Sequence, residues 1–357
     1  MRNSLTDVAG IAVGHATDLA LGSGVTAILF DRPATAAVCV LGGAPGGRDT
    51  GMLAPEMTVE AVDAIVLSGG SAFGLDAAGG VQAALREMGR GYAIRGARVP
   101  IVPQAIIFDL LNGGNKDWGR FSPYRELGYV AAQAAVRAAG GDAAFGDDFA
   151  LGDFALGSVG GGTGATTATV KGGLGSASAR TEAGHTVGAL AIVNAVGSPL
   201  IGTGPWFWAA PYEQGAEFGG LGWPSQIDTS LRLKGGSGAS MTGTNVQGTS
   251  TTIGLVATDA TLTKAQAQRL AIMAHDGLAR AVLPAHAPLD GDTIFAAATG
   301  RRALGDAVPE LTALGFAATL VMARAIARGV YAATALPVPG GQAAWCDRFG
   351  ATQIINT

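Results

Sequence analysis

Residues 248–259 constrain the fold most strongly, because they pass from a glycine-flanked, hydroxyl-rich segment into an apolar run. Ile253 and Leu255 favour extended backbone, and the threonines before them are β-branched, so the pattern predicts a buried strand that begins near Thr251. The preceding residues 234–248 are rich in glycine and serine and carry few apolar side chains. We therefore predict a flexible approach that leads into a buried strand.

Thr251 would gain two reactive groups if the chain were cut on its amino-terminal side. The cut would leave a side-chain hydroxyl and a free α-amine on one residue. Because an α-amine has a pKa of about 7.7–8.0, it can take the hydroxyl proton at neutral pH. The alternative is a polar strand entry without chemistry, and from the residues of this stretch alone that alternative stays open.

The remaining chain alternates between predicted strands and helices. Apolar runs predict strands at residues 11–13, 24–30, 36–41, 64–67, 187–193 and 293–298. Helical periodicity and capping signals predict helices over residues 72–88, 123–139 and 311–331, and another helix after the capping box at residues 263–266. No repeat period is present, so the pattern favours one layered α/β domain.

Composition narrows the classes of partner. Hydrophobic residues make up 48% of the chain and charged residues 14%, which indicates a large buried fraction and favours a homo-oligomer. The net charge of −4 gives no electrostatic basis for nucleic-acid binding. The uncharged stretch between Glu182 and Glu213 is interrupted by glycines and prolines, so we expect no membrane span. Two cysteines far apart fit a cytoplasmic protein, as does Asp7, an acid where a signal peptide would need its apolar core.

Other motifs carry weaker chemical signals. The glycine-rich run around Gly162 and Gly164 lacks the spacing of a phosphate-binding loop. His286, Asp290 and Asp292 lie close together in the sequence, but an acidic turn is commoner than a metal site with this spacing. We expect no metal and no cofactor.

Several segments taken together resemble one family of proteins. They are Gly42-Gly43-Ala44-Pro45-Gly46, Leu67-Ser68-Gly69-Gly70-Ser71-Ala72-Phe73-Gly74-Leu75, Pro103-Gln104-Ala105-Ile106-Ile107-Phe108-Asp109, Val170-Lys171-Gly172-Gly173, Val193-Asn194, Thr251-Thr252-Ile253-Gly254 and Leu289-Asp290-Gly291-Asp292-Thr293. In this order and spacing the chain resembles the DmpA-type self-processing hydrolases. That family includes L-aminopeptidase/D-esterase, β-peptidyl aminopeptidases and the nylon-oligomer hydrolase NylC.

The resemblance implies an α-β-β-α sandwich of the N-terminal-nucleophile hydrolase type, formed by residues 1–357 as one domain. It implies a cut between Ser250 and Thr251 that leaves chains 1–250 and 251–357 folded together, and a tetramer of these processed heterodimers. Thr251 matches the nucleophile. At the other catalytic positions, Lys171 matches a lysine beside the nucleophile, and Asn194 matches an asparagine suited to binding the oxyanion. Asp290 and Asp292 match acidic residues that orient the lysine or the threonine amine.

The chain departs from the family pattern at two positions. Ser250 stands where many members have asparagine or glycine, so Ser250 and Thr252 stay open as alternative nucleophiles. Phe108 stands where some members have a tyrosine that donates to the oxyanion, and phenylalanine cannot donate. We expect Phe108 to contact substrate together with Trp206 and Trp208, which lie in an aromatic loop.

The expected activity is hydrolysis of a small amide through an acyl-enzyme on Thr251. Candidate substrates are short peptides, β-peptides and ω-amino acid oligomers such as nylon fragments. The alternative is an uncleaved, non-catalytic relative of the same fold that binds a small molecule.

Overall fold

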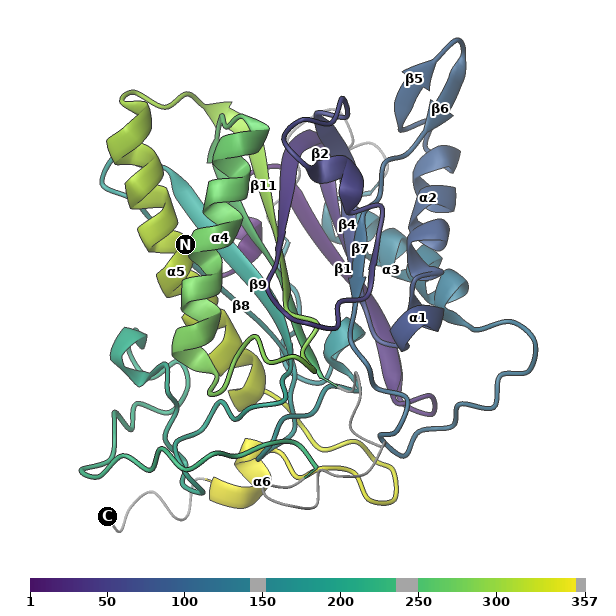
Figure 1. Ribbon diagram of the computed structural model, residues 1–357. Helices are drawn as coiled ribbons and strands as arrows, with labels where there is room; N and C mark the ends of the chain where they lie inside the picture. The colour runs from purple at the N-terminus through teal and green to yellow at the C-terminus, as the bar shows by residue number, and fades with distance from the viewer. Residues whose placement is uncertain (142–151, 236–249, 351–357) are drawn as a thin grey trace.

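The computed structural model describes residues 1–141, 152–235 and 250–350 (Figure 1). The strands are β1 Ile11–Asp18, β2 Ser23–Val40, β3 Gly47–Arg48, β4 Ala61–Ser68, β5 Tyr92–Ile94, β6 Ala97–Val99, β7 Gln104–Ile106, β8 Leu174–Arg180, β9 Thr186–Asn194, β10 Thr251–Ala260 and β11 Thr293–Arg302. The helices are α1 Ser71–Gly74, α2 Ala77–Glu87, α3 Tyr124–Ala138, α4 Lys264–Ala281, α5 Ala307–Tyr331 and α6 Trp345–Phe349.

Strand β2 links two layers of strands. Among the described residues, eight strands are hydrogen-bonded in the order β3-β7-β4-β2-β11-β10-β9-β8, and β1 pairs with β2 as the ninth. The first half of β2 pairs with β1, from Ile11 opposite Phe30, whereas the second half pairs with β11, from Thr293 opposite Val40. Residues 23–30 of β2 pair with β1, and residues 35–40 pair with β11, so β2 passes from one layer into the other.

Within the described residues, apolar side chains form three clusters that separate four layers. Along β10, Ile253 and Leu255 belong to a central cluster, whereas Val256 belongs to a cluster beneath α4 and α5. Along β4, Ile65 belongs to the central cluster, whereas Val66 belongs to a third cluster beneath α2 and α3. Since side chains alternate across a strand, each strand layer is covered by helices on one face and by the other layer on the second.

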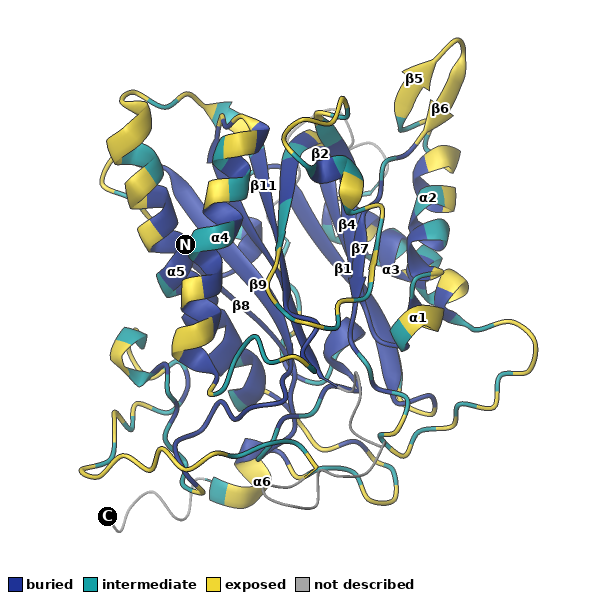
Figure 2. Ribbon diagram, in the orientation of Figure 1, coloured by how far each residue is buried: buried dark blue, intermediate teal, exposed yellow. Residues whose placement is uncertain are grey.

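The same layering is visible in the ribbon. Helices α4 and α5 lie on the left in Figure 1, α2 and α3 on the right, and the strands run between them. Figure 2 shows the strands between the helices buried almost throughout, whereas the β5–β6 hairpin is exposed and the helices expose one face. The predicted α-β-β-α sandwich in a single layered domain is confirmed.

Several predicted elements have different bounds. The strands predicted at residues 24–30 and 36–41 are one strand, β2, because Arg32 and Pro33 lie exposed where it changes layer and shifts register against β4. The helix predicted over residues 72–88 is divided into α1 and α2. The predicted capping box is confirmed, since the Thr263 side chain accepts a hydrogen bond from the Gln266 N–H at the start of α4.

Helix α5 is the one helix among the described residues that has the length and hydropathy of a membrane span. Its most apolar window has a mean hydropathy of 1.4, and 67% of that window is buried within the protein. The helix packs against α4, β8 and β9. These contacts are those of a core helix.

Candidate active site

Three neighbouring strands bring most of the predicted site together. Thr251 is the first residue of β10 and lies opposite Asn194, the last residue of antiparallel β9. On the other side, β11 runs parallel to β10 and is preceded by Asp290 and Asp292. Ser250 forms a parallel bridge with Asp290. The ends of β9, β10 and β11 therefore meet at one edge, with four of the five predicted catalytic residues in a row.

The peptide bond between Ser250 and Thr251 is buried within this row. Both residues are at most 2% exposed. The Thr251 hydroxyl donates a hydrogen bond to the Ser250 carbonyl oxygen. The Gly291 N–H donates to the same oxygen at 3.0 Å. The hydroxyl of the predicted nucleophile is therefore in contact with the carbonyl group of its own preceding peptide.

Asp292 fixes the main chain beside the predicted nucleophile. Its Oδ1 accepts the Thr252 N–H at 2.7 Å, and its Oδ2 accepts both the His286 N–H at 2.9 Å and the His286 Nδ1 at 2.8 Å. His286 is thus a partner of Asp292. The sequence placed both residues in one acidic turn but gave no signal for this contact.

Asp290 holds the loop on the other side of Gly291. Its carboxylate accepts the Val196 N–H at 3.0 Å and the Ala287 N–H at 3.2 Å. Burial, with the neighbouring charge of Asp292, raises the pKa of Asp290 to about 6. Both aspartates therefore accept main-chain N–H groups, and Asp290 also interacts electrostatically with the Lys234 ammonium.

Asn194 is completely buried and connects three segments. Its Oδ1 accepts the Thr166 N–H at 3.0 Å and the Lys234 ammonium at 2.9 Å, and its Nδ2 donates to the Phe108 carbonyl at 3.2 Å. Lys234 was predicted only as the start of a flexible approach, and this part of the prediction is wrong. Residues 236–249, the rest of that predicted approach, lie outside the described part of the chain.

Lys171 reaches the site through its backbone. It forms a β-bridge with Thr166, the residue whose N–H binds Asn194. Its ammonium donates to the carbonyls of Gly172 at 2.9 Å and Gly162 at 3.2 Å, so these hydrogen bonds of the buried amine go to main-chain oxygens. Burial lowers the pKa of Lys171 to about 7, with Asp109 opposing that shift and Lys234 adding to it.

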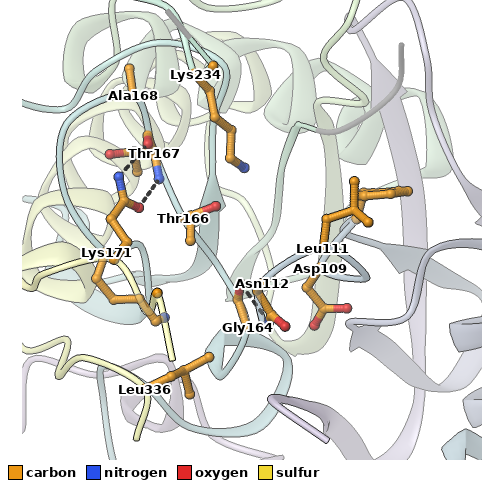
Figure 3. A pocket seen from close by; sticks show the side chains of 14 residues that line it. Asp109, Leu111, Asn112, Gly164, Thr166, Thr167, Ala168, Lys171, Lys234 and Leu336 are labelled. Atoms are coloured by element: carbon orange, nitrogen blue, oxygen red, sulfur yellow. Dashed lines mark hydrogen bonds between the residues drawn. The ribbon is translucent and has the colours of Figure 1, made fainter. Parts of the chain in front are cut away.

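A cavity of roughly 370 Å³ opens beside these groups (Figure 3). Lys171, Lys234 and Asp109 are the charged residues of its lining, and Figure 3 shows the two lysine side chains reaching in from different segments. Phe108, predicted to contact substrate, also lines this cavity. Burial lowers the pKa of Lys234 to about 7, with Asp290 and Asp109 opposing the shift.

The expected contribution of Trp206 and Trp208 to this pocket is wrong. Neither residue lines the cavity. Phe207 between them is 3% exposed and packs against Phe218 and Trp345. Because Phe207 packs in the core, Trp206 and Trp208 on either side of it lie half-buried and outside the cavity.

Most of the chain matches a known protein family. The model of peptidase family S58 matches residues 3–344. An uncharacterized aminopeptidase of Mycobacterium tuberculosis (strain ATCC 25618 / H37Rv) is 43% identical, covering 95% of this chain and 96% of the relative. An uncharacterized aminopeptidase of Mycobacterium leprae (strain TN) is 41% identical, covering 97% of this chain and 94% of the relative.

Solved structures share the fold. A β-aminopeptidase of Burkholderia sp. has a TM-score of 0.67 at 23% identity, covering 98% of this chain and 92% of its own. The L-aminopeptidase D-Ala-esterase/amidase of Ochrobactrum anthropi has a TM-score of 0.60 at 21% identity, covering 95% of this chain and 89% of its own. The latter is described as a variant of the Ntn hydrolase fold.

Proposed function

Because this chain belongs to peptidase family S58, we propose that it is an aminopeptidase or amidase that first cuts its own chain between Ser250 and Thr251. The family match confirms the resemblance found in the sequence. The proposal goes further, since it names Thr251 as the nucleophile and residues 1–250 and 251–357 as the products of the cut.

One observation carries the proposal. The Thr251 hydroxyl is hydrogen-bonded to the carbonyl that it would have to attack, in a buried position between β9 and β11. Holding two reacting groups in contact replaces a bimolecular encounter with an intramolecular step. Because β10 is paired on both sides along its length, the two chains would stay together after the cut.

After the cut, Thr251 supplies both nucleophile and base. Its hydroxyl attacks the substrate carbonyl, its α-amine takes the hydroxyl proton and returns it to the leaving amine, and water then releases the acid from the acyl-enzyme. Asn194 stabilises the developing oxyanion by exchanging its bond to the Phe108 carbonyl for one to the substrate. Lys171 and Lys234, with pKa values of about 7, exchange protons readily at neutral pH and supply positive potential.

The proposed substrates are small amides with a free amine, because the relatives are described as aminopeptidases. A cavity of roughly 370 Å³ has room for a short acyl group and excludes a folded protein. We also propose a homo-oligomer. The β5–β6 hairpin exposes Tyr92, Ile94 and Val99 (Figure 2), and a two-stranded hairpin is only marginally stable in water unless it packs against something else.

A hydrolysis panel tests the proposed activity. It compares L- and D-aminoacyl amides, β-dipeptides and 6-aminohexanoate oligomers with the N-acetylated form of each compound. We expect at least one free-amine substrate to be hydrolysed, and its acetylated form to react at least about tenfold more slowly. Equal rates on the two forms would contradict the aminopeptidase proposal. A protein that stays uncut and hydrolyses none of these compounds would favour the uncleaved, non-catalytic binding relative.

A further inference from the structure

We propose that the main-chain N–H of Gly291 is the oxyanion donor for self-cleavage, separate from the Asn194 amide that serves substrate hydrolysis. This inference rests on the proposed cut between Ser250 and Thr251. It assigns a catalytic group to the glycine between Asp290 and Asp292, a position to which the residue pattern gave no role.

The donor already contacts the oxygen on which charge would develop. The Gly291 nitrogen lies 3.0 Å from the Ser250 carbonyl oxygen, within the parallel bridge between Ser250 and Asp290. Ser250 is 1% exposed, so solvent hardly competes for this oxygen. An N–H group at this distance is a suitable oxyanion donor, because its bond strengthens as the oxygen becomes negative.

The surrounding backbone holds the Gly291 N–H in place. The carbonyl of Asp290 accepts the Ala44 N–H at 2.8 Å, and the carbonyl of Asp292 accepts the Leu41 N–H at 3.1 Å. The two carboxylates are bound to N–H groups of other segments, including Thr252 and Val196. Residues 290–292 are therefore anchored before and after Gly291. A donor fixed in advance costs no reorganisation when the reaction begins.

The proposed step accounts for every bond and proton. The Thr251 Oγ bonds to the Ser250 carbonyl carbon, and the carbonyl π electrons move to its oxygen, where the Gly291 N–H stabilises the charge. The intermediate then collapses, the bond from that carbon to the Thr251 nitrogen breaks, and the proton lost by the hydroxyl ends on that nitrogen. Water hydrolyses the resulting ester, which gives the Ser250 carboxylate and restores the Thr251 hydroxyl.

Space explains why this position holds glycine. A Cβ atom at residue 291 would lie 2.7 Å from the Thr251 Oγ1 and 2.7 Å from the Ala44 carbonyl oxygen. Both distances are well inside ordinary contact, and the backbone there offers little room to shift. A side chain would therefore push the nucleophile away from the carbonyl that it attacks.

Asn194 does not take this role in the uncut chain. Its Nδ2 donates to the Phe108 carbonyl, whereas the hydrogen-bond donors to the Ser250 oxygen among the described residues are Thr251 and Gly291. Self-cleavage and substrate hydrolysis thus draw on two different donors, one from the main chain and one from a side chain.

An ester in place of the peptide bond between Asp290 and Gly291 tests the inference. Cell-free translation with glycolic acid at position 291 removes the N–H and adds no atoms to the crowded side of the residue. The same ester at Gly51, where a Cβ would meet nothing within 4 Å, is the control for ester lability and translation. Gly291→Ala, which keeps the N–H but crowds Thr251, is the second variant, with Gly51→Ala as its control.

The readout is the time course of the cut before Thr251, followed by intact mass. We expect wild type and both Gly51 controls to be cut alike, and both Gly291 variants to be cut at least about a hundredfold more slowly. Cutting at the wild-type rate in the ester variant, which lacks the Gly291 N–H, overturns the inference while the proposed function stands. Cutting at the wild-type rate in Gly291→Ala, which keeps the N–H, overturns the steric reason given for glycine at this position. A wild-type chain that is never cut before Thr251 overturns the self-cleavage proposal, and the inference with it.

Discussion

Replacing Thr251 with alanine is expected to give one uncut chain of 35.4 kDa with no measurable amide hydrolysis. Alanine removes the hydroxyl that contacts the Ser250 carbonyl, so neither the ester intermediate of self-cleavage nor the acyl-enzyme can form. The loss should be at least about 10⁴-fold in kcat, because the nucleophile and the other groups act as a unit. Intact mass and turnover of one free-amine amide measure both effects.

Thr251→Ser is the matched control for this substitution. Serine keeps a hydroxyl at the same position, so cutting and hydrolysis should persist at reduced rates. Retained hydrolysis by Thr251→Ala would move the nucleophile elsewhere. The sequence left Ser250 and Thr252 as alternative nucleophiles. Among these three residues of the described structure, Thr251 is the one whose hydroxyl donates a hydrogen bond to the carbonyl oxygen of the preceding residue.

Replacing Lys171 with methionine is expected to lower kcat by about a hundredfold or more in protein that still folds. Methionine keeps the length of the buried side chain but removes the amine, whose pKa of about 7 lets it exchange protons at neutral pH. The amine also supplies positive potential to the cavity shared with Lys234 and Asp109. Steady-state hydrolysis of a free-amine amide by the cut protein measures the change.

Lys264→Met is the matched control for Lys171→Met. Lys264 is also buried and also donates to two carbonyls, those of Met57 and Met52, but it begins α4 and does not line the cavity. Its replacement should leave kcat within about threefold of wild type, because Lys264 lies outside the cavity and makes no proposed contact with the transition state. Near-wild-type turnover in Lys171→Met would reduce Lys171 to a structural cation.

The pH dependence of stability shows whether the buried amine titrates as described. The folded pKa of Lys171, about 7, lies below the ordinary lysine pKa of 10.5, so the unfolded chain binds more protons between these values. The free energy of unfolding should therefore rise with pH in this window, by at most about 1.4 kcal/mol per pH unit from this group. Compared in the uncut Thr251→Ala background, Lys171→Met should lack that rise, as measured by denaturant unfolding.

Local sequence patterns were sufficient for the strand that carries Thr251 and for the capping box at Thr263, because these depend on side-chain size and on short hydrogen bonds. The contact between His286 and Asp292 depends on a loop conformation in which His286 has a positive φ of 56°, which no periodicity encodes. The bond from Lys234 to Asn194 depends on the path of residues 195–235, which carry little regular structure.

The side chains of Trp206 and Trp208 also could not be placed from the local sequence. An aromatic run between prolines is compatible with a pocket wall or with a core contact, and only the packing of Phe207 decides which side faces inward. The resemblance placed Asn194, Asp290 and Asp292 in one site because it carries three-dimensional information that residue spacing lacks. Spacing alone had favoured an ordinary acidic turn.

Intact mass combined with N-terminal sequencing of natively purified protein tests the central claim most directly. We predict two chains that stay associated, of about 25 kDa and about 10.6 kDa by scaling the 35.4 kDa mass to residue number, with the smaller beginning Thr251-Thr252-Ile253. A single 35.4 kDa chain that hydrolyses amides, or a smaller chain that begins at another residue, would contradict the account.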